Sequence, residues 1–135
     1  MNIIKIGMRY LYFGKGKGMN IKECYALMEA DYEGAIECLL TEERLLKFYK
    51  MFNQATYLSD LEKSMNDKDY ENAFLTVHGL KGICSSLGFK ELKQSSSELC
   101  EALRGGNITV DVRPLFEQVK KDYQRVLEAY KLLEV

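Results

Sequence analysis

The residue best suited to chemistry in this sequence is His78, the one histidine among 135 residues. In a helix with 3.6 residues per turn, Lys81, Gly82 and Ser85 follow it at spacings of three, four and seven and share its face. Gly79 and Gly82 each cost a helix interior about 1 kcal/mol relative to alanine, so both need a reason other than helix stability. We infer that the reason is access, because a residue without a side chain lets another molecule approach the imidazole closely.

A second face of the same segment predicts how the histidine is presented. Apolar residues recur there at helical spacing and form a stripe that must face a core: Ala73, Val77, Leu80, Cys84 and Leu87. His78 lies well away from this stripe, so we expect its imidazole to be exposed to solvent. An exposed imidazole is partly neutral at physiological pH and can act as a nucleophile.

The residues around His78 resemble a known signature. The run His78-Gly79-Leu80-Lys81-Gly82, followed by Ser85, Leu87 and Gly88, is similar to the pattern His-x-x-Lys-Gly, then Leu-Gly, of the histidine phosphotransfer (HPt) domain family. Two other stretches also resemble the family, namely Asp31 to Ala35 and the pattern from Leu92 to Leu103 that ends at Arg104-Gly105-Gly106. The resemblance covers roughly residues 19–135. It implies a phosphorelay signalling protein of a two-component system, in which a histidine exchanges a phosphoryl group with the aspartate of response-regulator receiver domains.

The resemblance implies a role for each residue on this face. His78, through its Nε2, would accept and donate the phosphoryl group, and the Lys81 ammonium would offset the charge of the phosphoryl oxygens. Gly82 would leave room for the receiver, and Ser85 would donate a hydrogen bond to the phosphoryl group. The implied partners are receiver domains and a hybrid sensor kinase, and the magnesium needed for transfer would belong to the receiver. We therefore expect a monomeric phosphocarrier, with no cofactor and no ATP-dependent kinase activity of its own.

Two residues depart from the usual family pattern. Many members carry Glu or Gln near the position of Cys100, where a polar side chain can support the histidine, and a thiol is a weak substitute. Gly79 is less usual than Ala or Ser and favours a more mobile helix. The main alternative function is a helical adaptor that docks a receiver or another signalling protein without phosphotransfer. A further alternative is the dimerisation helix of a sensor kinase, but such a helix usually has an acidic residue where this chain has Gly79.

The elements that must position this face are predicted to be helices throughout. A single proline and abundant Leu, Glu, Lys and Ala favour an all-α fold over a β-sandwich, which would need many turns. Capping and turn signals predict an antiparallel four-helix bundle with helices over about 41–66, 69–87, 90–104 and 111–133. Two short N-terminal helices, capped by Asn20 and Asp31, would pack on one end of the bundle. Gly88 is placed to end the signature helix in the left-handed conformation.

The first predicted bundle helix has an apolar face that changes direction. Leu45, Phe48, Tyr49 and Phe52 share one side, whereas Leu58, Leu61 and Met65 lie nearly opposite. Either the two ends contact different neighbours, or the helix bends near Thr56.

Charge and composition exclude several other functions. Nineteen basic and twenty acidic residues nearly cancel, and residues 1–18 carry four of the basic residues and no acidic one. The remainder is net acidic, which argues against nucleic acid as a partner. We find neither an apolar run long enough for a membrane span nor a signal peptide, so we expect a cytoplasmic protein without a membrane partner.

The four cysteines do not predict a metal site. Cys24, Cys38, Cys84 and Cys100 are widely spaced, and no second histidine completes a zinc site. We expect reduced thiols that pack as small apolar residues.

Residues 1–18 differ in composition from the predicted domain over 19–135. They are basic, aromatic and glycine-rich, and their Gly-Lys repeats lack the spacing of a phosphate-binding Walker A loop. The segment is either a native, disordered extension or an upstream reading-frame extension before a natural start at Met19.

Overall fold

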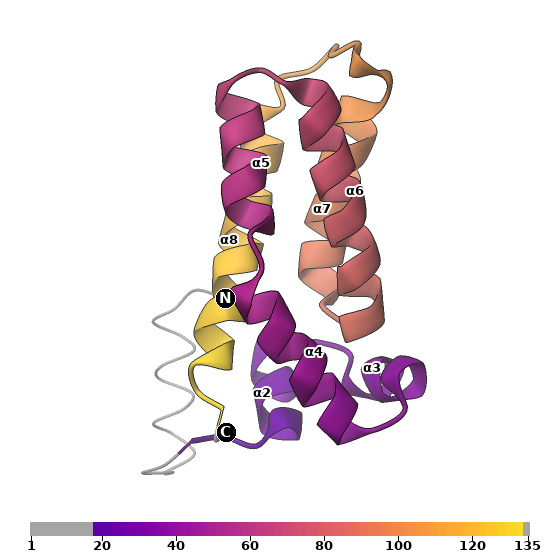
Figure 1. Cartoon of the computed structure of the whole chain (residues 1–135), viewed down its shortest axis with the longest axis vertical. Helices are drawn as coiled ribbons and strands as arrows, with labels where there is room; N and C mark the ends of the chain where they lie inside the picture. Colours follow the sequence, from indigo (N-terminus) through magenta and orange to yellow (C-terminus); the bar gives the residue numbers. More distant parts are fainter. Residues whose placement is uncertain (1–17, 134–135) are drawn as a thin grey trace.

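The computed structural model describes residues 18–133, and its regular structure is helical. The helices, in chain order, are α2 (Ile21–Met28), α3 (Tyr32–Leu39), α4 (Glu42–Gln54), α5 (Tyr57–Asn66), α6 (Tyr70–Leu87), α7 (Lys90–Leu103), the short 3₁₀ helix η1 (Arg104–Gly106) and α8 (Arg113–Tyr130) (Figure 1). Within residues 18–133 there is no strand, and one isolated bridge pairs Met19 with Leu133. The predicted extension over residues 1–18 lies outside the described residues except for Gly18.

Four helices form the long body of the molecule, as the sequence predicts. Helices α5, α6, α7 and α8 run along the same axis, with α6 packed against both α5 and α7, and α7 packed against α8 (Figure 1). Helices α2, α3 and α4 gather at one end of this body. The prediction of an all-α, four-helix bundle with short N-terminal helices is confirmed.

Side-chain caps start several of these helices where the sequence places them. The side chains of Asn20, Asp31 and Thr41 each accept a hydrogen bond from the backbone N–H three residues later, at 2.8, 3.0 and 3.1 Å. The last helix differs from the prediction. It begins at Arg113, with Val112 as its N-cap residue, and the Asp111 carboxylate accepts a hydrogen bond from the Arg113 N–H at 3.1 Å.

The predicted helix over 41–66 is wrong as a single element, because the chain breaks it into α4 and α5. Ala55 is extended, with φ −74° and ψ 160°, and Thr56 starts the next helix. The physical reason is the change of apolar direction. Phe52 is buried before the break and Leu61 after it, and one straight helix would place them on nearly opposite sides. The bend near Thr56, one of the two alternatives in the sequence, is the one that the structure adopts.

Gly88 fixes the end of α6 against the start of α3. Its φ of +74° is the left-handed conformation predicted from the sequence. The Asp31 N–H donates to the Gly88 carbonyl at 2.8 Å, and a Cβ on Gly88 would lie 2.3 Å from the Asp31 carbonyl oxygen. Only glycine fits this contact, which determines where the signature helix ends.

Three of the four cysteines are buried, as expected for small apolar residues. Burial raises the pKa of the Cys24 thiol to about 12, and it raises the pKa of Cys84 as well, so both are protonated at neutral pH. Cys38 departs from the expectation, because it is exposed on α3. Helix α3 has only two turns and buries only Ala35 and Leu39, so Cys38 lies on its outer side next to Glu37.

Candidate functional site

Helix α6 presents His78 to solvent. Its apolar stripe, Ala73, Val77, Leu80, Cys84 and Leu87, is buried along the whole helix. His78 lies on the outer side and is exposed, as the helical spacing predicts.

The two glycines beside His78 differ in their surroundings. A Cβ on Gly79 would lie 3.8 Å from Cε1 of Tyr57, at the start of α5, which is ordinary contact. A Cβ on Gly82 would meet nothing within 4 Å. The described part of the chain therefore gives no packing reason for glycine at position 82, and the open space lies one turn from the imidazole.

Lys81 and Ser85 share this face with His78. Lys81 is partly exposed and Ser85 is exposed. Among the described residues, no hydrogen bond or ion pair links either of them to His78. The four predicted site residues are thus brought together by helical spacing rather than by contact, and they leave an open polar surface.

Cys100 approaches His78 from α7. Its Sγ lies 4.0 Å from Nδ1 of the imidazole, at the outer limit for a sulfur hydrogen bond. Burial raises the pKa of the Cys100 thiol, and the nearby positive charges of Arg104 and Lys81 partly oppose the shift. A protonated thiol therefore faces Nδ1, and no described residue makes a hydrogen bond to Nε2.

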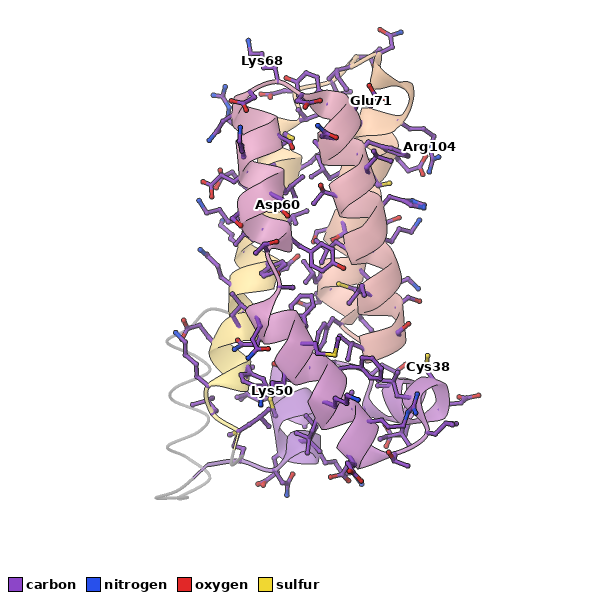
Figure 2. The ribbon with its side chains drawn as sticks, viewed as in Figure 1. Cys38, Lys50, Asp60, Lys68, Glu71 and Arg104 are labelled. Atoms are coloured by element: carbon purple, nitrogen blue, oxygen red, sulfur yellow. The ribbon has the colours of Figure 1, made fainter. Side chains whose placement is uncertain are left out.

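An aromatic ring and an ion pair near the histidine were not predicted from the sequence. Phe74 stacks on His78, with ring centroids 5.8 Å apart and planes inclined by 20°. The Arg104 guanidinium carbon lies 5.2 Å from the Phe74 centroid, and Nη2 of Arg104 donates to Glu101 at 2.8 Å. Arg104 lies on the outer side of the α6–α7 pair (Figure 2). The spacing of four residues between Phe74 and His78 is a signal that could have indicated the stack, whereas the approach of Arg104 depends on how α7 packs.

An apolar groove adjoins the other side of the histidine face. It has a volume of about 400 Å³ and is lined by Leu39, Phe48, Met51, Phe52, Ala55, Tyr57, Ile83, Ser86 and Leu87. The break between α4 and α5 forms one wall, and the C-terminal half of α6 forms the other. Met51 and Ile83 are 53% and 37% exposed, so the groove carries apolar surface that the chain itself does not cover.

The pKa of Glu101 is lowered mainly by its hydrogen bond with Arg104, with a smaller effect from the charge of Lys81. The side of the site that faces α7 thus holds two cations and one carboxylate near the imidazole.

Within residues 18–133, no three His, Cys, Asp or Glu side chains gather closely enough to hold a metal ion. Over the same residues, no helix is both long and apolar enough to cross a membrane.

An all-α bundle that displays a histidine on an open helix face is the class of protein that the fold and the site define. Comparison with known families places the chain within that class, because the Hpt domain family matches residues 53–129, from the end of α4 to the end of α8. The match covers more than half of the chain and includes His78, so the chain belongs to the Hpt domain family. Neither a search of curated proteins nor a search of solved structures gives a match. Hpt domains are phosphotransfer modules of phosphorelays rather than kinases, and their general partners are receiver domains.

Proposed function

We propose that the chain is a phosphorelay carrier in which His78 takes a phosphoryl group from the phosphoaspartate of a receiver domain and returns it to another. The observation that carries this proposal is the exposed imidazole on α6, whose Nε2 has no hydrogen-bond partner among the described residues, beside open space at Gly82. A nucleophile at the surface suits a protein that receives its phosphoryl group from a second protein, because the binding of that partner completes the reaction site.

In the proposed step, the lone pair of Nε2 forms a bond to phosphorus, while the bond from phosphorus to the aspartate oxygen breaks. The receiver regains a free carboxylate, and the proton on Nδ1 stays on the ring. Lys81 lies one turn along and offsets the negative charge of the phosphoryl oxygens, and Ser85 donates a hydrogen bond to them. The magnesium ion that assists the transfer is held by the receiver.

The apolar groove between the α4–α5 break and α6 is the surface on which we expect the receiver to dock. Tyr57 and Ile83 line the groove, and Tyr57 also lies next to Gly79, so groove and histidine face are continuous. A receiver that places an apolar helix face in this groove would bring its aspartate over α6. We further propose that residues 19–135 act as one domain, because Met19 is buried and its N–H donates to the Leu132 carbonyl at 2.7 Å.

The proposal is tested by incubating the full chain with a phosphorylated receiver and magnesium, using receivers from its own genome. We expect a phosphate on the chain that is labile to acid and stable to base, and that is absent from His78→Gln. A hybrid sensor kinase is the proposed source of the phosphoryl group upstream of that receiver. If the wild-type chain binds a receiver but takes up no phosphate from any of them, the adaptor function replaces the carrier function.

A further inference from the structure

An exposed histidine on a helix is free to rotate unless neighbouring groups hold its ring. In this chain the neighbouring helix offers a thiol to Nδ1 at 4.0 Å. A thiol is a weak donor and a weak acceptor, and this distance is at the limit of an interaction. The Cys100 contact alone is therefore a poor restraint on the imidazole.

Phe74 supplies a second contact, on the face of the ring. It precedes His78 by four residues on α6, so its side chain lies on the adjacent turn of the same side. The two rings are nearly parallel, with centroids 5.8 Å apart, within the range of favourable aromatic pairs. Phe74 is itself partly buried against the core, so it is a firmer support than an exposed side chain would be.

Arg104, the first residue of η1 directly after α7, contacts the phenylalanine. Its guanidinium carbon lies 5.2 Å from the Phe74 centroid, within the range of a cation–π contact. The guanidinium is oriented by Glu101, to which Nε and Nη2 donate hydrogen bonds of 3.3 and 2.8 Å. Because α6 and α7 are antiparallel, Arg104 meets Phe74 one turn away from the place where Cys100 meets His78.

We propose that Phe74, held by the Arg104–Glu101 pair, is the positioning residue of the phosphoacceptor. The stack fixes the plane of the imidazole and the Cys100 contact marks its Nδ1 edge, so Nε2 is directed toward solvent. This inference rests on the proposed function, and it assigns to an aromatic stack the orientation that a polar side chain at position 100 would otherwise supply.

The test compares Phe74→Leu, which keeps an apolar side chain but removes the ring, with Phe74→Tyr, which keeps the ring. At saturating phosphorylated receiver, we expect Phe74→Leu to slow transfer to His78 about three- to tenfold, and Phe74→Tyr to stay within about twofold of wild type. The receiver concentration at half saturation should not change in either variant. A wild-type rate in Phe74→Leu, or equal losses in both variants, would overturn the proposal.

Cys100→Ala separates the stack from the thiol. We expect it to slow transfer less than Phe74→Leu does, and a larger effect of Cys100→Ala would assign the positioning to the thiol instead. Arg104→Gln removes the group that holds Phe74, and Lys131→Gln is its matched control, because Lys131 forms an exposed ion pair with Glu128 at the same spacing of three residues. If Phe74→Leu does not fold, as judged by circular dichroism, Arg104→Gln carries the test, and equal rates in the two Gln variants overturn the proposal.

A readout without any receiver keeps this inference separate from the proposed function. Carbon-13 relaxation of the His78 ring in the full, unphosphorylated chain measures how firmly the imidazole is held. We expect a lower order parameter in Phe74→Leu than in wild type and Phe74→Tyr, and no difference would overturn the inference. If the wild type accepts no phosphoryl group, the carrier function fails, while this measurement still decides whether the stack holds the ring.

Discussion

Gly82 is one turn from His78, and the described part of the chain makes no contact there that would require a glycine. A Cβ there would meet no atom within 4 Å, so Gly82→Ala should fit without strain. We expect that variant to raise the free energy of unfolding by about 1 kcal/mol, since alanine is the better helix former. Urea unfolding followed by circular dichroism measures the gain.

A longer side chain at the same position tests access to the imidazole. Gly82→Gln should keep the helicity of the wild type and slow transfer from a phosphorylated receiver by an order of magnitude or more, because the amide would lie where the receiver approaches. Gly82→Ala is the matched control and should transfer faster than Gly82→Gln. Equal transfer rates in the wild type and Gly82→Gln would remove the steric role of this glycine.

At this scale the helical period is sufficient to predict that His78 is exposed and that Lys81, Gly82 and Ser85 share its face. The stack with Phe74 follows the same spacing but requires a particular rotamer of each ring, which the sequence does not specify. The approach of Cys100 and Arg104 depends on the packing of α7 against α6. The exposure of Cys38 was missed because a two-turn helix buries too few positions to show a clear period.

The break between α4 and α5 matters at the scale of elements, because it forms one wall of the apolar groove. Asp substitutions in the groove place a charge where we expect an apolar receiver surface to bind. Met51→Asp and Ile83→Asp should raise the dissociation constant of a receiver about tenfold or more, with the fold intact. Calorimetric titration of an unphosphorylated receiver measures the change.

Val110→Asp is the control for these two variants. Val110 is 54% exposed, much as Met51 is, but it lies in the loop before α8 and does not line the groove. We expect it to leave the receiver affinity unchanged. Similar losses in all three variants would mean that the added negative charge, and not the groove, weakens binding.

Analytical sedimentation shows whether a second copy of the chain occupies the groove instead. In that case the wild type would sediment as a dimer, and Ile83→Asp would dissociate it.

The elements themselves were largely predictable, because caps such as Asn20, Asp31 and Thr41 mark helix starts by local chemistry. The sequence did not decide whether residues 41–66 form one straight helix or a helix that bends near Thr56. Its apolar residues change direction near Thr56, but that pattern fits a straight helix with two sets of neighbours equally well. The choice depends on whether Phe52 and Leu61 face one core, which is a property of the packed molecule.

At the scale of the whole molecule, several contacts hold the short N-terminal helices against the bundle, and two of them lie at the ends of α2 and α6. One is the contact between Asp31 and Gly88. The other is Arg125 of α8, which is buried, pairs with Glu91 and donates from Nη2 to the Met28 carbonyl at the end of α2, at 2.6 Å. A cation at a helix C-terminus interacts favourably with the helix dipole. These contacts connect α2 and α3 to the elements that carry His78.

Gly88→Ala tests the first of these ties, with Gly106→Ala as its control. Both glycines have a left-handed φ, of +74° and +72°, so both variants carry the strain of an alanine there, about 1 kcal/mol. Only the Cβ at position 88 would also collide with a backbone atom, at 2.3 Å, whereas the one at 106 would meet nothing within 4 Å. We expect Gly88→Ala to lose clearly more unfolding free energy in urea than Gly106→Ala. Equal losses would show that the Asp31 contact does not hold the two parts together.

The central claim is that His78 carries a phosphoryl group from one receiver domain to another. Phosphorus-31 NMR of both transfer steps, onto His78 and away from it, tests this claim most directly. The full chain is loaded from a phosphorylated receiver with magnesium, separated from it, and mixed with an unphosphorylated receiver. We predict a phosphohistidine signal from Nε2 of His78 after loading, and its replacement by a phosphoaspartate signal after mixing. Release of inorganic phosphate without any phosphohistidine signal, or a phosphorylated residue that persists in His78→Gln, would contradict the account.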